Sequence, residues 1–503
     1  MSNKSTSSLN LSSIIKDNLI VIVGVLLLNL KAIILIPIII KHTGTGMYGA
    51  YVLFNSLVGI IYAISSLGVG ITKNRFLPGS ETRKEKSELF YPQFFFTIIT
   101  TLCFSLILIL TSDIIREFIF KNGYEFSSLL FLAYLISYFF YAQGQDFFRY
   151  TSRIRLMTLG SVVFPYLSIL FILTSINYIG FIDINILVLS ESLAAIIIGV
   201  FFFQKILKEI GFKFSFFRLH KLKKEIILGF PLTINMIVDF ILSSSDRYFI
   251  AYFISVNAVA YYNAPYILGT IILIIPRALG MVIPQLMFKY FDKGDELAAK
   301  NINKYTIKIF FIFAIPFIFG CFLISDLIIE LLANEEVALN SYYVTPLIAI
   351  ASVFSGLTYI LSNVMFLQLN TRLILKANLI ASILNIILNI ILLKIFGNIL
   401  VAAITTILSY AIAFVYIQKQ IEEEWRVSLN IGFISKVLLS SFVMYLILEI
   451  LIYFLDSFSN SIQIISILIV SVPIYISLCV LFGVFSKEEK NFIQSSFRSF
   501  DPF

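Results

Sequence analysis

Charged and chemically reactive side chains are scarce in this sequence. Only 13% of its 503 residues are charged, and it contains two histidines, three cysteines and one tryptophan. Cys103, Cys321 and Cys479 lie far apart inside apolar runs, so the sequence supports neither a disulfide framework nor a metal cluster. His42 and His220 fall in separate predicted loops, which leaves no histidine–carboxylate constellation for catalysis. There is also no Gly-rich phosphate loop, which argues against a primary ATP-driven pump.

Apolar residues are abundant instead. They make up 59% of the chain, and the mean hydropathy is +0.95. A soluble chain of this length has too much wetted surface to hide such a composition. The apolar runs are long enough to cross a hydrocarbon core of ~30 Å as helices. They lack the alternation of membrane β-strands. The sequence therefore predicts an all-α integral membrane protein.

About fourteen transmembrane helices are predicted. The expected spans are 18–40, 47–71, 89–111, 127–148, 157–177, 184–204, 226–251, 258–287, 305–325, 342–367, 375–393, 397–417, 431–455 and 461–483. Most of the 37 Lys and Arg residues fall in every second loop, beginning with the N-terminal segment. By the positive-inside rule, both termini are predicted to be cytoplasmic. The basic charge is thus explained by topology, and no nucleic-acid partner is expected.

The predicted domain organisation is two helical bundles followed by two additional C-terminal helices. The richest basic loop separates spans 6 and 7, and the segment Gly49-Ala50-Tyr51 is echoed by Ala260-Tyr261-Tyr262. Paired repeats of this kind are common in transporters. The boundaries are a six-helix bundle over 1–204, a basic linker over 205–225, a second six-helix bundle over 226–417, and two further helices with a tail over 418–503.

Ionic groups retained inside predicted spans are the candidate site residues. A charge at the bilayer centre costs ~2.5–3.5 kcal/mol even on the permissive insertion scale. The retained groups include Lys31 in span 1 and Arg247 near the outer end of span 7. Two polar faces are predicted on adjacent helices. They consist of Asn235, Asp239, Ser243 and Asp246 in span 7, and Asn263, Thr270 and Arg277 in span 8.

Span 8 also contains Pro265, Pro276 and Pro284, which favour kinks. Glu191 and Glu449, nearer the predicted outer face, are interpreted as interfacial groups.

Four stretches resemble a known family. They are residues 45–51 with 67–70 and Arg75; residues 245–248 with 258–262 and 284–285; residues 370–372 with Asn378, Asn385 and Asn389; and residues 396–397 with 401–406. Together they are similar to the Wzx-type polysaccharide flippases of the MATE-like multidrug/oligosaccharidyl-lipid/polysaccharide superfamily. Lys394 stands where that family often has a proline. The resemblance implies a V-shaped, two-lobed MATE-like fold with alternating access.

The resemblance further implies a function. Such a protein, in the bacterial cytoplasmic membrane, would flip undecaprenyl-diphosphate-linked oligosaccharide units for O-antigen, lipopolysaccharide or capsule synthesis. Its partners would be this polyprenyl-diphosphate-linked oligosaccharide, membrane lipid, and a polysaccharide polymerase with chain-length machinery. The alternatives are an ion-coupled drug or cation antiporter and a peptidoglycan lipid-precursor flippase. A membrane-embedded glycan polymerase or transferase is disfavoured, because the largest external loop, 326–341, is short. No catalytic residue, metal or cofactor is expected.

Two interpretations of the intramembrane charges remain open. In the first interpretation, the diphosphate head group is attracted by Lys31 and Arg277, together with Arg247. The binding site is then lined by Asn235, Asp239, Asp246, Asn263 and Thr270. Asp239 is then also the candidate ion-coupling residue. In the second, the charges pair with one another, Asp246 with Arg247 and Asp239 with Lys31 or Arg277, and only hold the bundle together.

Overall fold

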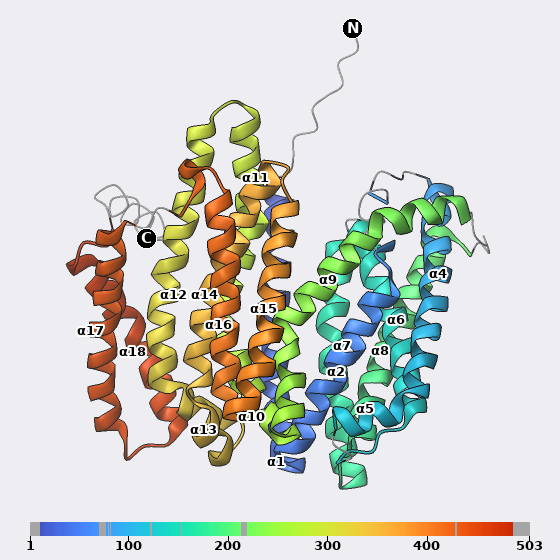
Figure 1. The fold of residues 1–503 in the computed structure, drawn as a ribbon, viewed down its shortest axis with the longest axis horizontal. Helices are drawn as coiled ribbons and strands as arrows, with labels where there is room; N and C mark the ends of the chain where they lie inside the picture. The colour runs from blue at the N-terminus through green and yellow to red at the C-terminus, as the bar shows by residue number, and fades with distance from the viewer. Residues whose placement is uncertain are drawn as a thin grey trace, which may run out of the picture. The chain divides into compact units, whose positions relative to one another are not determined.

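The computed structural model describes residues 11–69, 77–78, 80, 82–120, 123–151, 153–212, 219–427 and 430–485. In these ranges the regular elements are all helical (Figure 1). Gly70 and Arg75, the middle of the basic linker and the end of the C-terminal tail lie outside the described residues.

The helices follow the apolar runs of the sequence. Their bounds are α1 Leu11–Thr43, α2 Thr45–Ser65, α4 Arg83–Leu110, α5 Ser112–Phe118, α6 Ser128–Tyr150, α7 Ile154–Ile179, α8 Ile184–Ile210, α9 Leu219–Phe253, α10 Val256–Gly269, η1 Ile271–Leu273, α11 Ile274–Asp292, α12 Glu296–Leu332, α13 Glu335–Ser341, α14 Val344–Leu367, α15 Arg372–Phe396, α16 Ile399–Gln420, η2 Glu423–Trp425, α17 Ile431–Leu455 and α18 Asn460–Leu481. An all-α fold is therefore confirmed.

Each predicted span corresponds to helical structure. Thirteen spans within the described residues are long and apolar enough to cross a membrane, the stretch from α10 to α11 being one of them. The remaining predicted span is α6, which has 23 residues but carries Gln143, Gln145, Asp146 and Arg149 near its end. Helices suit lipid because every backbone donor and acceptor is satisfied within the segment.

The outward faces of these helices are apolar. Leu106 and Leu110 of α4 and Ile469 and Leu481 of α18 are all more than half exposed. A soluble monomer rarely exposes so much contiguous apolar surface, whereas lipid covers it without cost. The chain is thus a multi-pass membrane protein.

The chain forms two compact units. Unit 1 comprises the described residues of Met1–Asn263 together with Ser382–Asn398, and unit 2 those of Ala264–Ala381 together with Ile399–Phe503. The division falls within α10 and α15. Our predicted bundles, with boundaries at 204, 226 and 417, stay a prediction.

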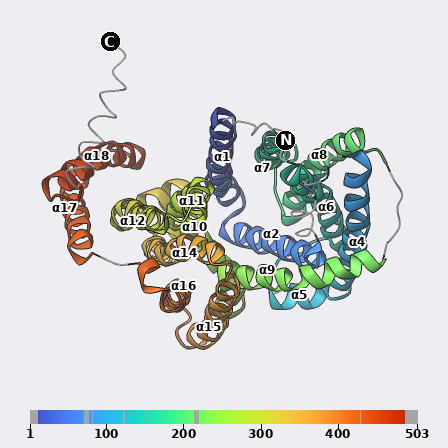
Figure 2. The same ribbon diagram turned by 90° about the horizontal axis from the view of Figure 1, so that it is seen from above.

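In unit 1, α6 packs against α8, and α1 packs against α7, as Figure 2 shows. In unit 2, α17 and α18 pack against each other and against α12. Leu323 and Ile324 of α12 meet Met444, Leu448 and Ile467 of this pair in one apolar cluster. The C-terminal helices are therefore held by side-chain packing within unit 2.

Predicted span 8 is interrupted. It consists of α10, the 3₁₀ turn η1 and α11 rather than one α-helix. Pro276 lies in the first turn of α11, and a proline has no N–H for the carbonyl four residues earlier, which its ring also crowds. That carbonyl belongs to Ile272, inside the 3₁₀ turn. The predicted kink therefore occurs just before the middle proline.

Close backbone approach fixes the start of α2. A Cβ atom on Gly49 would lie 2.1 Å from the carbonyl oxygen of Val256, at the start of α10. Gly59, in the same helix, has no atom within 4 Å of such a Cβ. Both glycines lie in the same helix, so an alanine at either position has a similar effect on helix propensity. Comparing the two substitutions therefore isolates the effect of the close packing at Gly49.

We expect Gly49→Ala to lower the apparent melting temperature of the purified protein, because one of the two backbones must shift. Gly59→Ala should leave it equal or higher, since alanine favours a helix by up to about 1 kcal/mol. Scanning fluorimetry in detergent measures both. Equal behaviour of the two variants would contradict the close approach.

Candidate functional site

The polar face predicted for span 7 occurs on α9. Asn235 Nδ2 donates to Asp239 Oδ2 at 3.1 Å, and Ser243 Oγ donates to the carbonyl oxygen of Asp239 at 2.8 Å. Residues four apart on a helix are neighbours, so the spacing gives the expected contacts. Asp239 is exposed and Asn235 half-buried within unit 1.

Asp246, one turn further, is enclosed by protein. Its side chain is 2% exposed. Tyr262 Oη of α10 donates to Asp246 Oδ2 at 2.8 Å, and Asn389 Nδ2 of α15 donates to Asp246 Oδ1 at 2.8 Å. The same Asn389 nitrogen lies 3.1 Å from Asn385 Oδ1, which also accepts from Ser245 Oγ at 3.2 Å. This network joins three helices of unit 1 through one buried carboxylate.

Arg247 is oriented by a second chain of hydrogen bonds. Its Nε donates to Asn263 Oδ1 at 2.7 Å, and its Nη1 donates to the carbonyl oxygen of Ser243 at 3.0 Å. Asn263 in turn donates from Nδ2 to Tyr48 Oη at 2.9 Å. The half-buried guanidinium is therefore held in place by α10 and α2. Asn263 and Arg247, both predicted site residues, are brought into direct contact.

Lys31 pairs with Glu191, which the sequence interpretation placed near the outer face as an interfacial group. Its Nζ lies 3.4 Å from Glu191 Oε1 of α8 and 6.0 Å from the centroid of the Phe164 ring. Tyr51 of α2 also donates its hydroxyl to Glu191. Glu191 is 1% exposed, while the Lys31 side chain is 22% exposed. The interpretation of Glu191 as an interfacial group is therefore wrong. It is a buried counter-ion.

Thr270 and Arg277 belong to unit 2. Thr270 directly precedes η1, and its Oγ1 donates to the carbonyl oxygen of Ile267 at 2.9 Å. Arg277 is an exposed residue of α11. The 3₁₀ turn η1 lies between Thr270 and Arg277, so the polar face predicted for span 8 does not belong to one continuous α-helix. The grouping of Asn263, Thr270 and Arg277 on one face stays a prediction.

Several partners of the predicted residues had not been singled out as site residues. They are Glu191, Tyr51, Tyr48, Tyr262 and Asn389. Glu191 carried a usable signal, because an acidic residue inside an apolar run needs a partner. Tyrosines of an apolar helix give no comparable signal.

Comparison with known proteins identifies the family to which this chain belongs. The sequence matches the polysaccharide biosynthesis protein family over residues 14–291, more than half of the chain, and the MatE family over residues 231–391. No curated protein matches the chain by sequence. The chain therefore belongs to the polysaccharide biosynthesis protein family, among the flippases of the multidrug/oligosaccharidyl-lipid/polysaccharide superfamily.

Solved structures share the fold. The lipid II flippase MurJ, in an inward closed conformation, is similar with a TM-score of 0.69 and 15% identity over 92% of this chain and 98% of that chain. An inward-facing multidrug resistance MATE transporter has a TM-score of 0.61 and 14% identity, over 80% of this chain and 96% of that one. A superfamily transporter from Pyrococcus furiosus has a TM-score of 0.52 and 14% identity, over 81% and 95%. The fold is thus MurJ-like and MATE-like, and these relatives are transporters and flippases rather than enzymes.

Proposed function

We propose that this protein flips undecaprenyl-diphosphate-linked oligosaccharide units from the inner to the outer leaflet of a bacterial cytoplasmic membrane. The observation that carries the proposal is membership of the polysaccharide biosynthesis protein family over residues 14–291. The MurJ-like fold supports the same kind of cargo, because that relative is itself a flippase of a lipid-linked precursor. Translocation requires no covalent chemistry, so the protein is proposed to act as a transporter without a catalytic residue or cofactor.

The intramembrane cations are the proposed head-group ligands. Lys31, Arg247 and Arg277 supply positive charge, and charge-assisted hydrogen bonds to phosphate are about twice as strong as neutral ones. Arg247 is already oriented by Asn263 at 2.7 Å, which reduces the ordering that binding requires. The polyprenyl tail stays in lipid, and the sugars pass between the polar side chains.

The neighbouring polar groups have supporting roles in this proposal. Asn235, Asp246, Asn263 and Thr270 line the path or hold the cations. Asp239, which accepts from Asn235 at 3.1 Å, stays the candidate ion-coupling residue. Both termini are proposed to be cytoplasmic, and a polysaccharide polymerase and its chain-length machinery are proposed as partners.

Arg277 offers a direct test of head-group recognition. We expect Arg277→Ala to lower export at least about tenfold, because a hydrogen bond to a charged group contributes ~1.5–3 kcal/mol. Folding should be unaffected, since exposed substitutions usually change stability by less than about 0.5 kcal/mol. Lys289→Ala, another exposed cation of α11, is the matched control. Normal export by the Arg277 variant would remove this residue from the site.

The function itself is tested by deletion. In the deletion strain, undecaprenyl-linked repeat units should accumulate on the inner leaflet, as measured by labelling in sealed membrane vesicles of defined orientation. Complementation with the intact chain should restore transfer. If the units still reach the outer leaflet at the original rate, the proposed substrate is wrong.

A second candidate cargo is a peptidoglycan lipid precursor. The MurJ structure covers 92% of this chain. The MatE match over residues 231–391 likewise favours an ion-coupled drug or cation antiporter as a third candidate. Reconstituted vesicles offered each cargo separately discriminate the three, because only the true cargo will be transported.

A further inference from the structure

A basic pocket lies in unit 2, and its lining includes none of the residues proposed for the transport path. It has a volume of about 430 Å³. Its walls come from the first half of α12, the segment before α17 with the first two turns of that helix, and the turn after α18. The charge pattern of the sequence assigns all three of these segments to the same, cytoplasmic side of the membrane. Their convergence on one pocket is consistent with that prediction.

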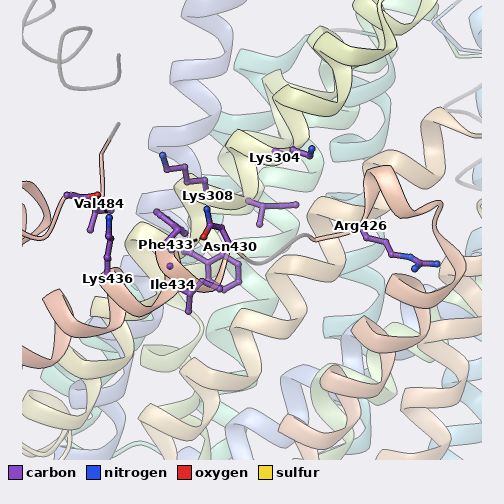
Figure 3. Close-up of a pocket in the computed structure, with 12 residues that line it drawn as sticks. Lys304, Lys308, Arg426, Asn430, Phe433, Ile434, Lys436 and Val484 are labelled. Carbon is purple, nitrogen blue, oxygen red and sulfur yellow. Dashed lines mark hydrogen bonds between the residues drawn. The ribbon is translucent and has the colours of Figure 1, made fainter. Parts of the chain in front are cut away.

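Three lysines line this pocket. Lys304 and Lys308 come from α12, and Lys436 comes from α17. Lys308 Nζ lies 5.3 Å from the centroid of the Phe433 ring, and Lys436 Nζ donates to the carbonyl oxygen of Gly483 at 3.2 Å. Figure 3 shows Lys308 above Phe433, and Lys436 beside the turn at Val484.

Three described acidic side chains near this end of unit 2 pair with Arg426 and Lys300. Glu423 accepts from Arg426 at 3.2 Å, and Glu296 lies 2.7 Å from Lys300, which also bonds to Glu424. The hydrogen bond from Lys300 lowers the pKa of the Glu424 carboxyl, and Lys304 makes a smaller electrostatic contribution. In Figure 3 the Arg426 side chain points away from the lysines. Among the described residues that line the pocket, none carries a carboxylate.

The backbone adds to the positive potential. Asn430 caps the N-terminus of α17, and its Oδ1 accepts from the Phe433 N–H at 3.3 Å. Asn430, Gly432 and Phe433 all line the pocket, so the first turn of a 25-residue helix borders it. A helix N-terminus carries a partial positive charge. It reinforces the three lysines.

The rest of the wall is apolar. Ile307 and Phe311 of α12 face Ile434 of α17 and Val484. A small hydrated anion would gain nothing from these groups. A phosphate ester joined to acyl chains would place its anion among the lysines and its glycerol and upper chain carbons against the apolar residues.

We propose that this pocket binds the head group of an anionic membrane phospholipid from the cytoplasmic leaflet. Such a lipid would bridge α12 to the C-terminal pair α17 and α18. The site is separate from head-group recognition by Lys31, Arg247 and Arg277. The lipid-binding proposal can therefore be tested independently of the identity of the transported substrate.

The test is lipid titration of the full-length protein in detergent, followed by native mass spectrometry. The probes are phosphatidylglycerol, phosphatidylcholine and inorganic phosphate. We expect phosphatidylglycerol to bind best. The Lys308→Gln/Lys436→Gln variant should bind it about 25-fold more weakly, because each basic residue near a lipid surface contributes ~1 kcal/mol, about fivefold. Lys308→Arg/Lys436→Arg should retain binding.

Matched controls are available on unit 1. Lys205 and Lys208 of α8 are exposed, and Lys205 Nζ also lies over a ring, 5.5 Å from the Phe201 centroid. Lys205→Gln/Lys208→Gln should bind phosphatidylglycerol like the parent. If Lys436→Gln prevents folding, Lys304→Gln/Lys308→Gln keeps the Lys436–Gly483 bond and gives the same test.

Three outcomes would overturn the proposal. The first is unchanged phosphatidylglycerol binding in the pocket variants, or an equal loss in the α8 control. The second is complete displacement of the lipid by millimolar inorganic phosphate, which would identify a small-anion site. The third is preference for a polyprenyl diphosphate over phosphatidylglycerol, which would assign the pocket to the transported cargo.

Discussion

Lys31→Met should reduce export at least about tenfold, and adding Glu191→Gln should not restore it. The single change leaves Glu191, 1% exposed, without its cation. Breaking a buried ion pair in this way costs about 3–5 kcal/mol, whereas neutralising both partners is often harmless. The double variant should therefore recover folding, measured as the yield of monodisperse protein. Export should stay low because the phosphate ligand is still missing.

This pair of variants separates the two interpretations of Lys31. If the lysine only holds the bundle, export will return together with folding in the double variant. That result would leave Lys31 a structural residue. Lys41→Met, in the last turn of the same helix, controls for loss of any α1 cation, and this variant should export normally.

Asp246→Leu should lower the apparent melting temperature strongly or prevent accumulation of folded protein. It leaves the buried Tyr262 hydroxyl and Asn389 amide without the acceptor they reach at 2.8 Å. Each unsatisfied buried donor costs ~1–3 kcal/mol, so the two donors together are expected to cost about 2–6 kcal/mol. Scanning fluorimetry of the purified protein measures the shift.

Two controls make that result specific. Glu449→Leu replaces an exposed carboxylate of α17 and should change the melting temperature little. The exchange Asp246→Asn/Asn389→Asp keeps one carboxylate and one amide in the network and should recover part of the loss. Equal destabilisation by Asp246→Leu and Glu449→Leu would show that the network contributes nothing.

The sequence predicted the transmembrane helices because lipid makes hydropathy a direct structural constraint. It did not predict how far they extend. α12 begins at Glu296, nine residues before its predicted span, because its first turns are polar and hydropathy marks only the part inside the bilayer. The short helices α5 and α13 were missed for the same reason.

The candidate residues on one helix were predictable, but their tertiary partners were not. The contact between Asn235 and Asp239 follows from a spacing of four. Lys31 and Glu191 are 160 residues apart, and Asp246 and Asn389 are 143 apart. A single sequence holds no record of such pairings. Lys308 and Lys436 appeared only as cations at the edges of spans, because nothing local indicates that α12 and α17 share a pocket.

The interruption at Thr270–Leu273 changes what bending costs in this part of the chain. A continuous helix that bends sharply must break backbone hydrogen bonds within the membrane, where no water replaces them. Here Pro276 has already removed the donor that would have reached the Ile272 carbonyl. Reorientation at this joint therefore breaks fewer backbone hydrogen bonds than the same motion in α8, a 27-residue helix without proline, would. The hydrogen bond to the Ile272 carbonyl was already lost when the protein folded.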